Sequence, residues 1–325
     1  MKSIKKYAAE FLGTFFLVFL GCTPACIFST VLPSKIMLSS YSFTTSESTF
    51  SNAILSLNLT SYVSLIVLTA LTFGLAFAAL YFCLSRVSGC HLNPAVSLAM
   101  LINKRLSFEH FMFYIVCQMA GGVCGSALTC FLFGDGIELG ANGFDLGSFF
   151  QTPILRAFVL EVVLTFFFVM VFLFVTARKR PFALSGVVLG LSLTAVYLVG
   201  IPFTGGSVNP ARSFGPALMD SFVNDGIALS QVWVFLLAPT VGAVLAALMF
   251  RLFCRPEPET GAFEPAPVLS ETPEGSAESG DAPLFEAPDD SSEDVQSPLP
   301  PKEDYFSGIL SQVKNTASPE DENKS

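Results

Sequence analysis

Two short segments decide the architecture of this chain: SGCHLNPAVSLAM at residues 88–100 and TGGSVNPARSFGPALM at residues 204–219. Each contains an Asn-Pro-Ala box, formed by Asn93, Pro94 and Ala95 in the first segment and by Asn209, Pro210 and Ala211 in the second. Asn followed by Pro favours a helix start, because the Asn side chain caps the first turn and Pro lacks the N–H that would stay unpaired there. The apolar residues that follow are too few to cross a bilayer, so each segment predicts a half-helix.

Six longer apolar segments accompany the two boxes. Hydrophobic residues make up 52% of the 325 positions and charged residues only 13%, which indicates that lipid surrounds most of the chain. A helix needs about 20 apolar residues to cross a bilayer. Six segments reach that length, at about 7–31, 62–84, 111–133, 157–176, 182–203 and 229–252. The sequence therefore predicts an all-α membrane protein with six transmembrane helices and two re-entrant half-helices.

The second half of the chain repeats the pattern of the first. Glu10, Thr14 and Phe15 recur as Glu161, Thr165 and Phe166, and the residues around the first Asn-Pro-Ala box recur 116 positions later. Each half carries three spans, which is an odd number, so the two halves enter the membrane in opposite directions and form an inverted repeat.

The inverted repeat predicts that Asn93 and Asn209 meet near the middle of the membrane. Irregular backbone is tolerated at that depth only where it lines a water-filled cavity or is buried in protein. The positive ends of both half-helices would then point at the same place and oppose the passage of cations and protons. Two Asn amides that donate to one water oxygen would also orient that water and interrupt a proton-conducting chain.

Charges near the ends of the spans predict the orientation. Lys and Arg gather on the side of both termini, whereas the other side holds only three: Lys35, Arg156 and Arg212. Both termini are therefore expected in the cytoplasm. The residues before Pro256 include 14 Lys and Arg against 9 Asp and Glu, and those from Pro256 onward include 3 against 17. We expect a channel domain at residues 1–254, with repeats at about 5–134 and 154–254, and a disordered, acidic, Pro/Glu/Ser-rich tail at 255–325.

A Ser/Thr-rich stretch separates the first two spans. Residues 28–61 are expected to form a long extracellular loop, in which Asn58-Leu59-Thr60 is a glycosylation sequon. The eight Cys are scattered through apolar segments without paired metal-ligand spacing, so they are interpreted as small apolar residues rather than disulfides or metal ligands.

Residues 5–254 resemble the aquaporin (major intrinsic protein) family, because both Asn-Pro-Ala boxes and the repeated Glu occupy matched positions and the second box continues with Arg212. The resemblance implies a right-handed six-helix bundle and a homotetramer with one pore per subunit. It also implies an outer constriction, or selectivity filter, at Phe73, Tyr197, Gly206 and Arg212. The family's water channels usually carry His at the position of Tyr197, and its glycerol channels carry Gly there with a second aromatic at the position of Gly206.

Charged and titratable residues at membrane depth are candidates for function in their own right. Arg212 would donate hydrogen bonds to a passing solute and repel cations; the alternative is an Arg that reaches the aqueous face. The resemblance implies that Glu10 and Glu161 accept hydrogen bonds from the re-entrant loops. His91 is expected to support its loop, and pH sensing is the alternative.

The predicted function is a passive channel for water that excludes protons and ions, located in the plasma membrane and requiring no cofactor or metal. Alternatives are a pore that also passes glycerol or other small neutral solutes, and a low-conductance structural protein. A secondary transporter would need paired ionisable groups at its substrate site, and the sequence offers none apart from Arg212 and the two repeated Glu. No catalytic constellation indicates an enzyme, and no basic patch indicates a nucleic-acid partner.

Overall fold

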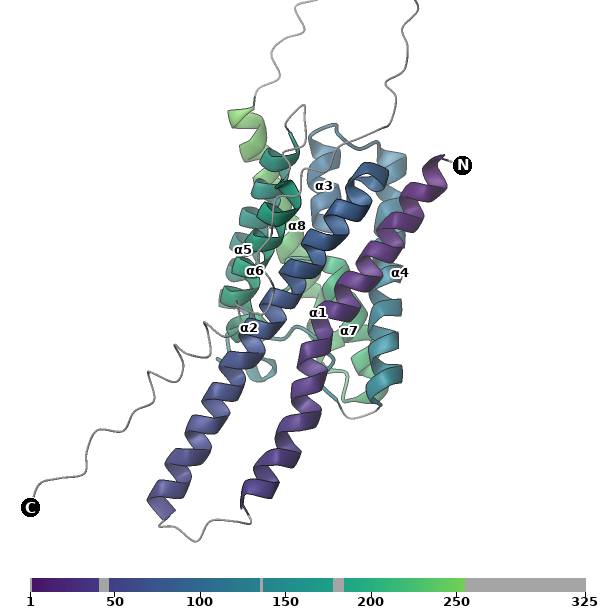
Figure 1. Ribbon diagram of the computed structural model, residues 1–325. Coiled ribbons are helices and arrows are strands. Elements are labelled where there is room, and N and C mark those ends of the chain that lie inside the picture. Colours follow the sequence, from purple (N-terminus) through teal and green to yellow (C-terminus); the bar gives the residue numbers. More distant parts are fainter. Residues whose placement is uncertain (1, 41–46, 135–136, 178–183, 255–325) are drawn as a thin grey trace, which may run out of the picture. The chain divides into compact units, whose positions relative to one another are not determined.

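The computed structural model describes residues 2–40, 47–134, 137–177 and 184–254, and for residues 2 and 30–60 it describes the backbone alone. Within these residues the chain is helical apart from short connections (Figure 1). The helices are α1 (Lys2–Ser40), α2 (Glu47–Ser88), α3 (Pro94–Ile102), α4 (Phe108–Phe133), α5 (Ile154–Thr176), α6 (Ser185–Thr204), α7 (Pro210–Val223) and α8 (Ile227–Phe253), with a 3-10 turn, η1, at Asp145–Gly147.

Six of these helices are long and apolar enough to cross a membrane, as the sequence predicts. The candidate spans are Ser3–Ser29, Ser61–Ser88, Phe108–Phe133, Ile154–Thr176, Ser185–Thr204 and Ile227–Phe253. Their ends lie within a few residues of the predicted ones. Local hydropathy was therefore sufficient to find every span in the described part of the chain.

The expectation of a loop at residues 28–61 was wrong for most of that stretch. Helix α1 continues to Ser40 and α2 begins at Glu47, and both extend past the other helices at one end of the bundle (Figure 1). Neither extension contains a glycine, and a high content of Ser and Thr does not by itself end a helix. The sequon at Asn58 lies on the backbone of α2, its side chain is not described, and its use stays a prediction.

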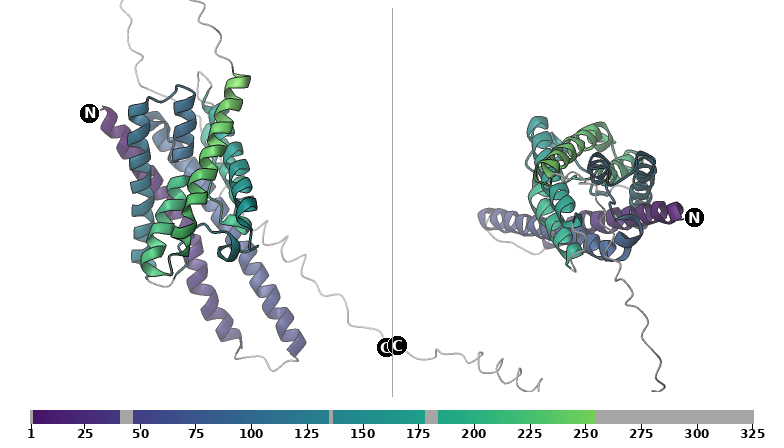
Figure 2. Two further views of the ribbon diagram at one scale, coloured as in Figure 1. Left: turned by 180° about the vertical axis from the view of Figure 1, so that it is seen from behind. Right: turned by 90° about the horizontal axis from the view of Figure 1, so that it is seen from above.

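The spans pack into one bundle that encloses both half-helices (Figure 2). Helix α1 packs against α2 and α4, α5 packs against α6 and α8, and α2 packs against α6 across the two halves. The α1–α4 contact depends on Gly121, because a Cβ atom there would lie 2.4 Å from the backbone oxygen of Phe11. Such close backbone approach stabilises helix pairs in lipid, where apolar burial contributes little.

The two half-helices begin where the Asn-Pro boxes predict. Helix α3 starts at Pro94 and α7 at Pro210, and the side chains of Asn93 and Asn209 cap them by accepting from the backbone N–H of Ala95 and Ala211. In Figure 1, α3 lies at the end of the bundle where the chain begins and α7 toward the opposite end, which we call the N-terminal and the distal side. Their first turns therefore point at each other inside the bundle.

Candidate functional site

Asn93 and Asn209 each hydrogen bond to the loop of the other half. The Nδ2 atom of Asn93 donates to the backbone oxygen of Val208 at 2.9 Å, and Nδ2 of Asn209 donates to the backbone oxygen of Leu92 at 2.8 Å. Both side chains are buried. An amide nitrogen carries two hydrogens, so each Asn keeps one donor beyond this bond. The predicted meeting of the two boxes is thus present in the geometry.

The carbonyls that accept these bonds come from residues with unusual backbone angles. Leu92 has a φ of 50° and Val208 a φ of 59°, in the left-handed region that side chains rarely adopt. Leu92 and Val208 are also 116 residues apart, the offset that relates the two boxes. Both loops therefore use the same strained turn to direct a carbonyl at the opposite Asn.

Two buried carboxylates hold the loops in that conformation. Glu10 accepts from the Ser88 hydroxyl at 2.6 Å and from the backbone N–H groups of His91 at 3.0 Å and Leu92 at 2.7 Å. It also accepts from Nε2 of Gln118 at 2.8 Å. Because a carboxylate offers four lone-pair sites, one side chain satisfies all of these donors.

Glu161 repeats the arrangement in the second half. It accepts from the Thr204 hydroxyl at 2.6 Å and from the backbone N–H groups of Ser207 at 2.9 Å and Val208 at 3.0 Å. The bonded positions lie 116 residues after their counterparts around Glu10. Both Glu side chains are therefore placed where support of the loops requires them.

His91 lies within its own loop, against α3. Its Nδ1 atom is 3.1 Å from the hydroxyl of Ser97, and its ring packs edge-on against Tyr114 and Phe172. The equivalent contact in the second half joins the hydroxyls of Ser207 and Ser213 at 2.6 Å. The bonding of the buried ring fits the support role, and the pH-sensing alternative stays a hypothesis.

The four residues of the expected constriction lie together on the distal side of the Asn pair. The rings of Phe73 and Tyr197 stack with centroids 4.0 Å apart and planes within 6°. The guanidinium carbon of Arg212 lies 5.2 Å from the Phe73 centroid and 5.9 Å from that of Tyr197. At Gly206, a Cβ atom would lie 2.9 Å from Cδ1 of Tyr197, so glycine leaves the space that the tyrosine ring fills.

Arg212 is held in place by backbone oxygens. Its Nη1 donates to Gly140 at 2.8 Å and its Nη2 to Gly205 at 3.3 Å, while Nε has no hydrogen-bond partner although the side chain is only 2% exposed. The guanidinium is therefore held beside the two rings by two hydrogen bonds, and its Nε–H is unpaired. Such a buried cation beside aromatic faces opposes other cations and can hydrogen bond to a neutral solute.

Sequence reasoning missed three residues of this site. Asn142 and Gly140 lie in the connection between α4 and α5, where Asn142 accepts from the Ser213 hydroxyl at 2.8 Å and donates to the Thr204 oxygen at 3.1 Å. Gln118 completes the shell of Glu10. No motif marks residues 137–153, and only the buried polar character of Gln118 in an apolar span gave a signal.

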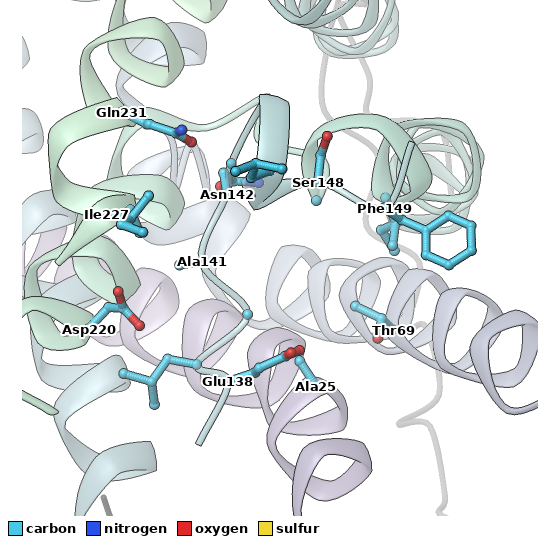
Figure 3. A pocket seen from close by; sticks show the side chains of 18 of the residues that line it. Ala25, Thr69, Glu138, Ala141, Asn142, Ser148, Phe149, Asp220, Ile227 and Gln231 are labelled. Carbon is cyan, nitrogen blue, oxygen red and sulfur yellow. The ribbon is translucent and has the colours of Figure 1, made fainter. Parts of the chain in front are cut away.

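A cavity of about 740 Å³ opens on the distal side of the constriction (Figure 3). Its lining includes Gly205 and Arg212, together with the carboxylates of Glu138, Asp220 and Asp225. We call this cavity the vestibule. On the N-terminal side a smaller cavity of about 200 Å³ is lined by residues that include Tyr81, Arg105 and Phe172. The Asn pair and the constriction lie between the two cavities.

Six spans and two half-helices that meet at paired Asn residues define a membrane channel. Comparison with known proteins gives the family: residues 1–250 match the Major intrinsic protein family. The chain therefore belongs to the major intrinsic protein family of multi-pass membrane channels, which are not enzymes.

Similar proteins include some named as aquaporins and one named as a glycerol uptake facilitator. "Aquaporin Z" of Rhodopseudomonas palustris is 35% identical over 270 residues, which cover 80% of this chain and 96% of the relative. "Glycerol uptake facilitator protein-like 6" of Lactiplantibacillus plantarum is 36% identical over 250 residues, covering 77% and 98%. The solved aquaglyceroporin from Plasmodium falciparum has the same fold, with a TM-score of 0.57 at 21% identity over 78% of this chain and 97% of that one.

Proposed function

We propose that this chain forms a passive pore for water that excludes ions and protons. The observation that carries the proposal is the Asn pair. Asn93 and Asn209 each donate one amide hydrogen to the opposite loop, and each keeps one that can be donated to a solute. A water molecule that accepts from both amides has its own hydrogens directed away from the pair, toward the two ends of the pore. A proton then has no continuous chain of hydrogen bonds to follow.

The half-helices add an electrostatic barrier at the same point. Each helix carries roughly half a positive unit charge at its N-terminus, and the first turns of α3 and α7 both face the pair. Arg212 adds a full charge at the constriction. Neutral solutes meet none of this repulsion, so the pore favours them over cations.

Selection among neutral solutes falls to Phe73, Tyr197, Gly206 and Arg212. The parallel stack of Phe73 and Tyr197 fills the constriction from one side, and Gly206 gives the tyrosine ring its space. A filter that contains two full aromatic rings and a fixed guanidinium leaves little width, which supports water over glycerol. Glu10, Glu161 and His91 support the loops in this scheme.

A pore that also passes glycerol is the second candidate. The relative named as a glycerol uptake facilitator, at 36% identity, favours it. Glycerol would need the two rings to separate from Arg212, because the carbon backbone of a polyol is wider than a single file of water.

The channel domain comprises residues 1–254 and sits in the plasma membrane as a homotetramer with one pore per subunit and both termini in the cytoplasm. The acidic tail at 255–325 forms a separate cytoplasmic segment. That segment lies outside the described residues.

Stopped-flow light scattering of proteoliposomes tests the proposal. Vesicles containing the protein should shrink much faster than empty vesicles under an impermeant osmolyte and should take up glycerol no faster than empty ones. Fast uptake of both solutes would establish the second candidate. Acceleration of neither would reject the open pore and support a structural membrane protein.

A further inference from the structure

The connection between α4 and α5 carries one of the two carbonyls that hold Arg212. Gly140, in this connection, accepts from Nη1 of Arg212 at 2.8 Å. Gly140 lies outside the helices, so its carbonyl is not fixed by the hydrogen bonds of a helix. The position of the guanidinium therefore depends on the groups that hold residues 140–144 in place.

Gln231 on α8 binds this connection through both ends of its side-chain amide. Its Oε1 accepts from the backbone N–H of Phe144 at 2.9 Å, and its Nε2 donates to the backbone oxygen of the same residue at 3.2 Å. Because an N–H needs an acceptor and a C=O needs a donor, the two bonds fit one orientation of the amide. A Cβ atom at Gly147 would lie only 3.2 Å from Oε1, so glycine lets the connection approach Gln231 (Figure 3).

The ring of Phe144 fastens the same residue to two spans. It is 8% exposed and packs in an apolar cluster with Ala157 of α5 and with Val234 and Phe235 of α8. Its centroid lies 6.4 Å from that of Phe235. The backbone bonds to Gln231 and the buried ring together make Phe144 the point at which the connection is attached to the second half of the bundle.

Two further bonds lie between Phe144 and Gly140. Nδ2 of Asn142 donates to the backbone oxygen of Thr204 at 3.1 Å, and the N–H of Gly143 donates to the same oxygen at 3.2 Å. Thr204 is the last residue of α6. Consecutive residues from Phe144 back to Gly140 are thus bound to α8 and α6, and a displacement of Phe144 would strain the bonds that orient the Gly140 carbonyl.

We propose that Gln231 is a positioning residue for the constriction. By binding both backbone groups of Phe144, it fixes the connection whose Gly140 carbonyl holds the Arg212 guanidinium. A group that selects among solutes must be held to within about half an ångström by the residues behind it, and Gln231 supplies that support from a different helix. Without the two bonds, the guanidinium occupies a wider range of positions and the constriction admits larger neutral solutes more often.

The first test replaces the amide with a side chain of the same length and branching. Gln231→Met removes both hydrogen bonds and should raise the ratio of glycerol to water permeability in proteoliposomes about two- to fivefold. Gln231→Glu keeps an acceptor for the Phe144 N–H, loses the donor, and should raise the ratio less. Thr240→Val is the control on the same helix, because its hydroxyl bonds only to the Leu236 oxygen of α8 and it lines neither cavity.

The second test makes the same substitution in the Arg212→Val protein. If Gln231 acts through Arg212, Gln231→Met should leave the glycerol-to-water ratio of that protein unchanged. A rise of equal size in both backgrounds would assign Gln231 a general packing role and reject the inference. Thermal unfolding in detergent identifies any variant that fails to fold, in which case Gln231→Glu carries the comparison.

The inference rests on the proposed constriction, and the design separates the two. A raised ratio in Arg212→Val with an unchanged ratio in Gln231→Met would reject the role of Gln231 alone. An unchanged ratio in both variants would overturn the constriction and the role of Gln231 with it. A wild-type protein that conducts no water would overturn the proposed channel as well.

Discussion

The first half of the bundle, α1 to α4, and the second, α5 to α8, support their re-entrant loops in the same way. They contribute different residues to the proposed constriction. Glu10 and Glu161 hold equivalent loops by equivalent bonds, and Leu92 and Val208 share one strained turn. Three of the four proposed constriction residues differ from their counterparts 116 positions away: Val96 corresponds to Arg212, Cys90 to Gly206 and Leu189 to Phe73. The repeat thus preserves the loop support, whereas three of the four residues of the proposed constriction lie in the second half.

The largest effect is expected where the halves agree. Glu10→Leu and Glu161→Leu should each abolish most folded protein, because three or four buried donors would lose their acceptor at about 1–3 kcal/mol each. Size-exclusion chromatography and thermal unfolding in detergent measure the loss. Glu→Gln at either position keeps one acceptor oxygen and should be milder. Normal stability of either Leu variant would show that the two halves are not supported alike.

A large change in selectivity is expected where the halves differ most. Arg212→Val gives the second half the residue of the first and removes the charge and the bonds to Gly140 and Gly205. Glycerol uptake should rise about tenfold, equivalent to about 1.4 kcal/mol of barrier, and proton exclusion should weaken. Stopped-flow scattering and a pH-sensitive dye inside the vesicles report both. Unchanged glycerol and proton fluxes would remove Arg212 from the filter.

An intermediate effect is expected at Gly206. Gly206→Cys copies Cys90, whose φ of 53° shows that this backbone tolerates a side chain in the first half. In the second half the new Cβ would lie 2.9 Å from Tyr197, so the ring must shift. The free energy of unfolding of the variant should be lower by about 1–3 kcal/mol, which thermal unfolding in detergent would detect. The variant should also conduct water more slowly in stopped-flow measurements.

The companion variant isolates the cause. In a Tyr197→Ala background Gly206→Cys should cost less stability than in the wild-type protein, because the atom that the new side chain meets is absent. An equal cost of Gly206→Cys in both backgrounds would instead assign the effect to backbone strain at Gly206, where φ is 65°.

The smallest effect is expected from the hydroxyl of Tyr197. It donates to the Ser207 oxygen at 3.4 Å, a long and weak hydrogen bond. Tyr197→Phe should therefore change water permeability by less than about twofold, with Tyr81→Phe in the other half as its control. A severalfold change in the Tyr197 variant alone would show that this hydroxyl contacts the solute rather than the loop.

The sequence predicts those parts of this molecule that local chemistry specifies. Apolar length located the six spans, and the Asn-Pro pair located the starts of both half-helices, because a cap and a missing N–H act within one turn. The continuation of α1 and α2 was missed, since Ser and Thr content is a weak signal. The contacts of Gly140 and Asn142 were also missed, because they form between residues far apart in sequence and depend on how the connection folds onto α7.

The exchange of hydrogen bonds between the two loops sets an order for synthesis. Asn93 donates to a carbonyl 115 residues later, and Leu92 accepts from an amide 117 residues later. At about 5–20 residues per second, the ribosome needs roughly 6–23 seconds to supply those partners. During that interval Glu10 can bind the first re-entrant loop, but the hydrogen-bond partners from the second loop have not yet been made. The nascent first half must therefore wait in the membrane as an incomplete unit, and closure of the pore is an event of the second half.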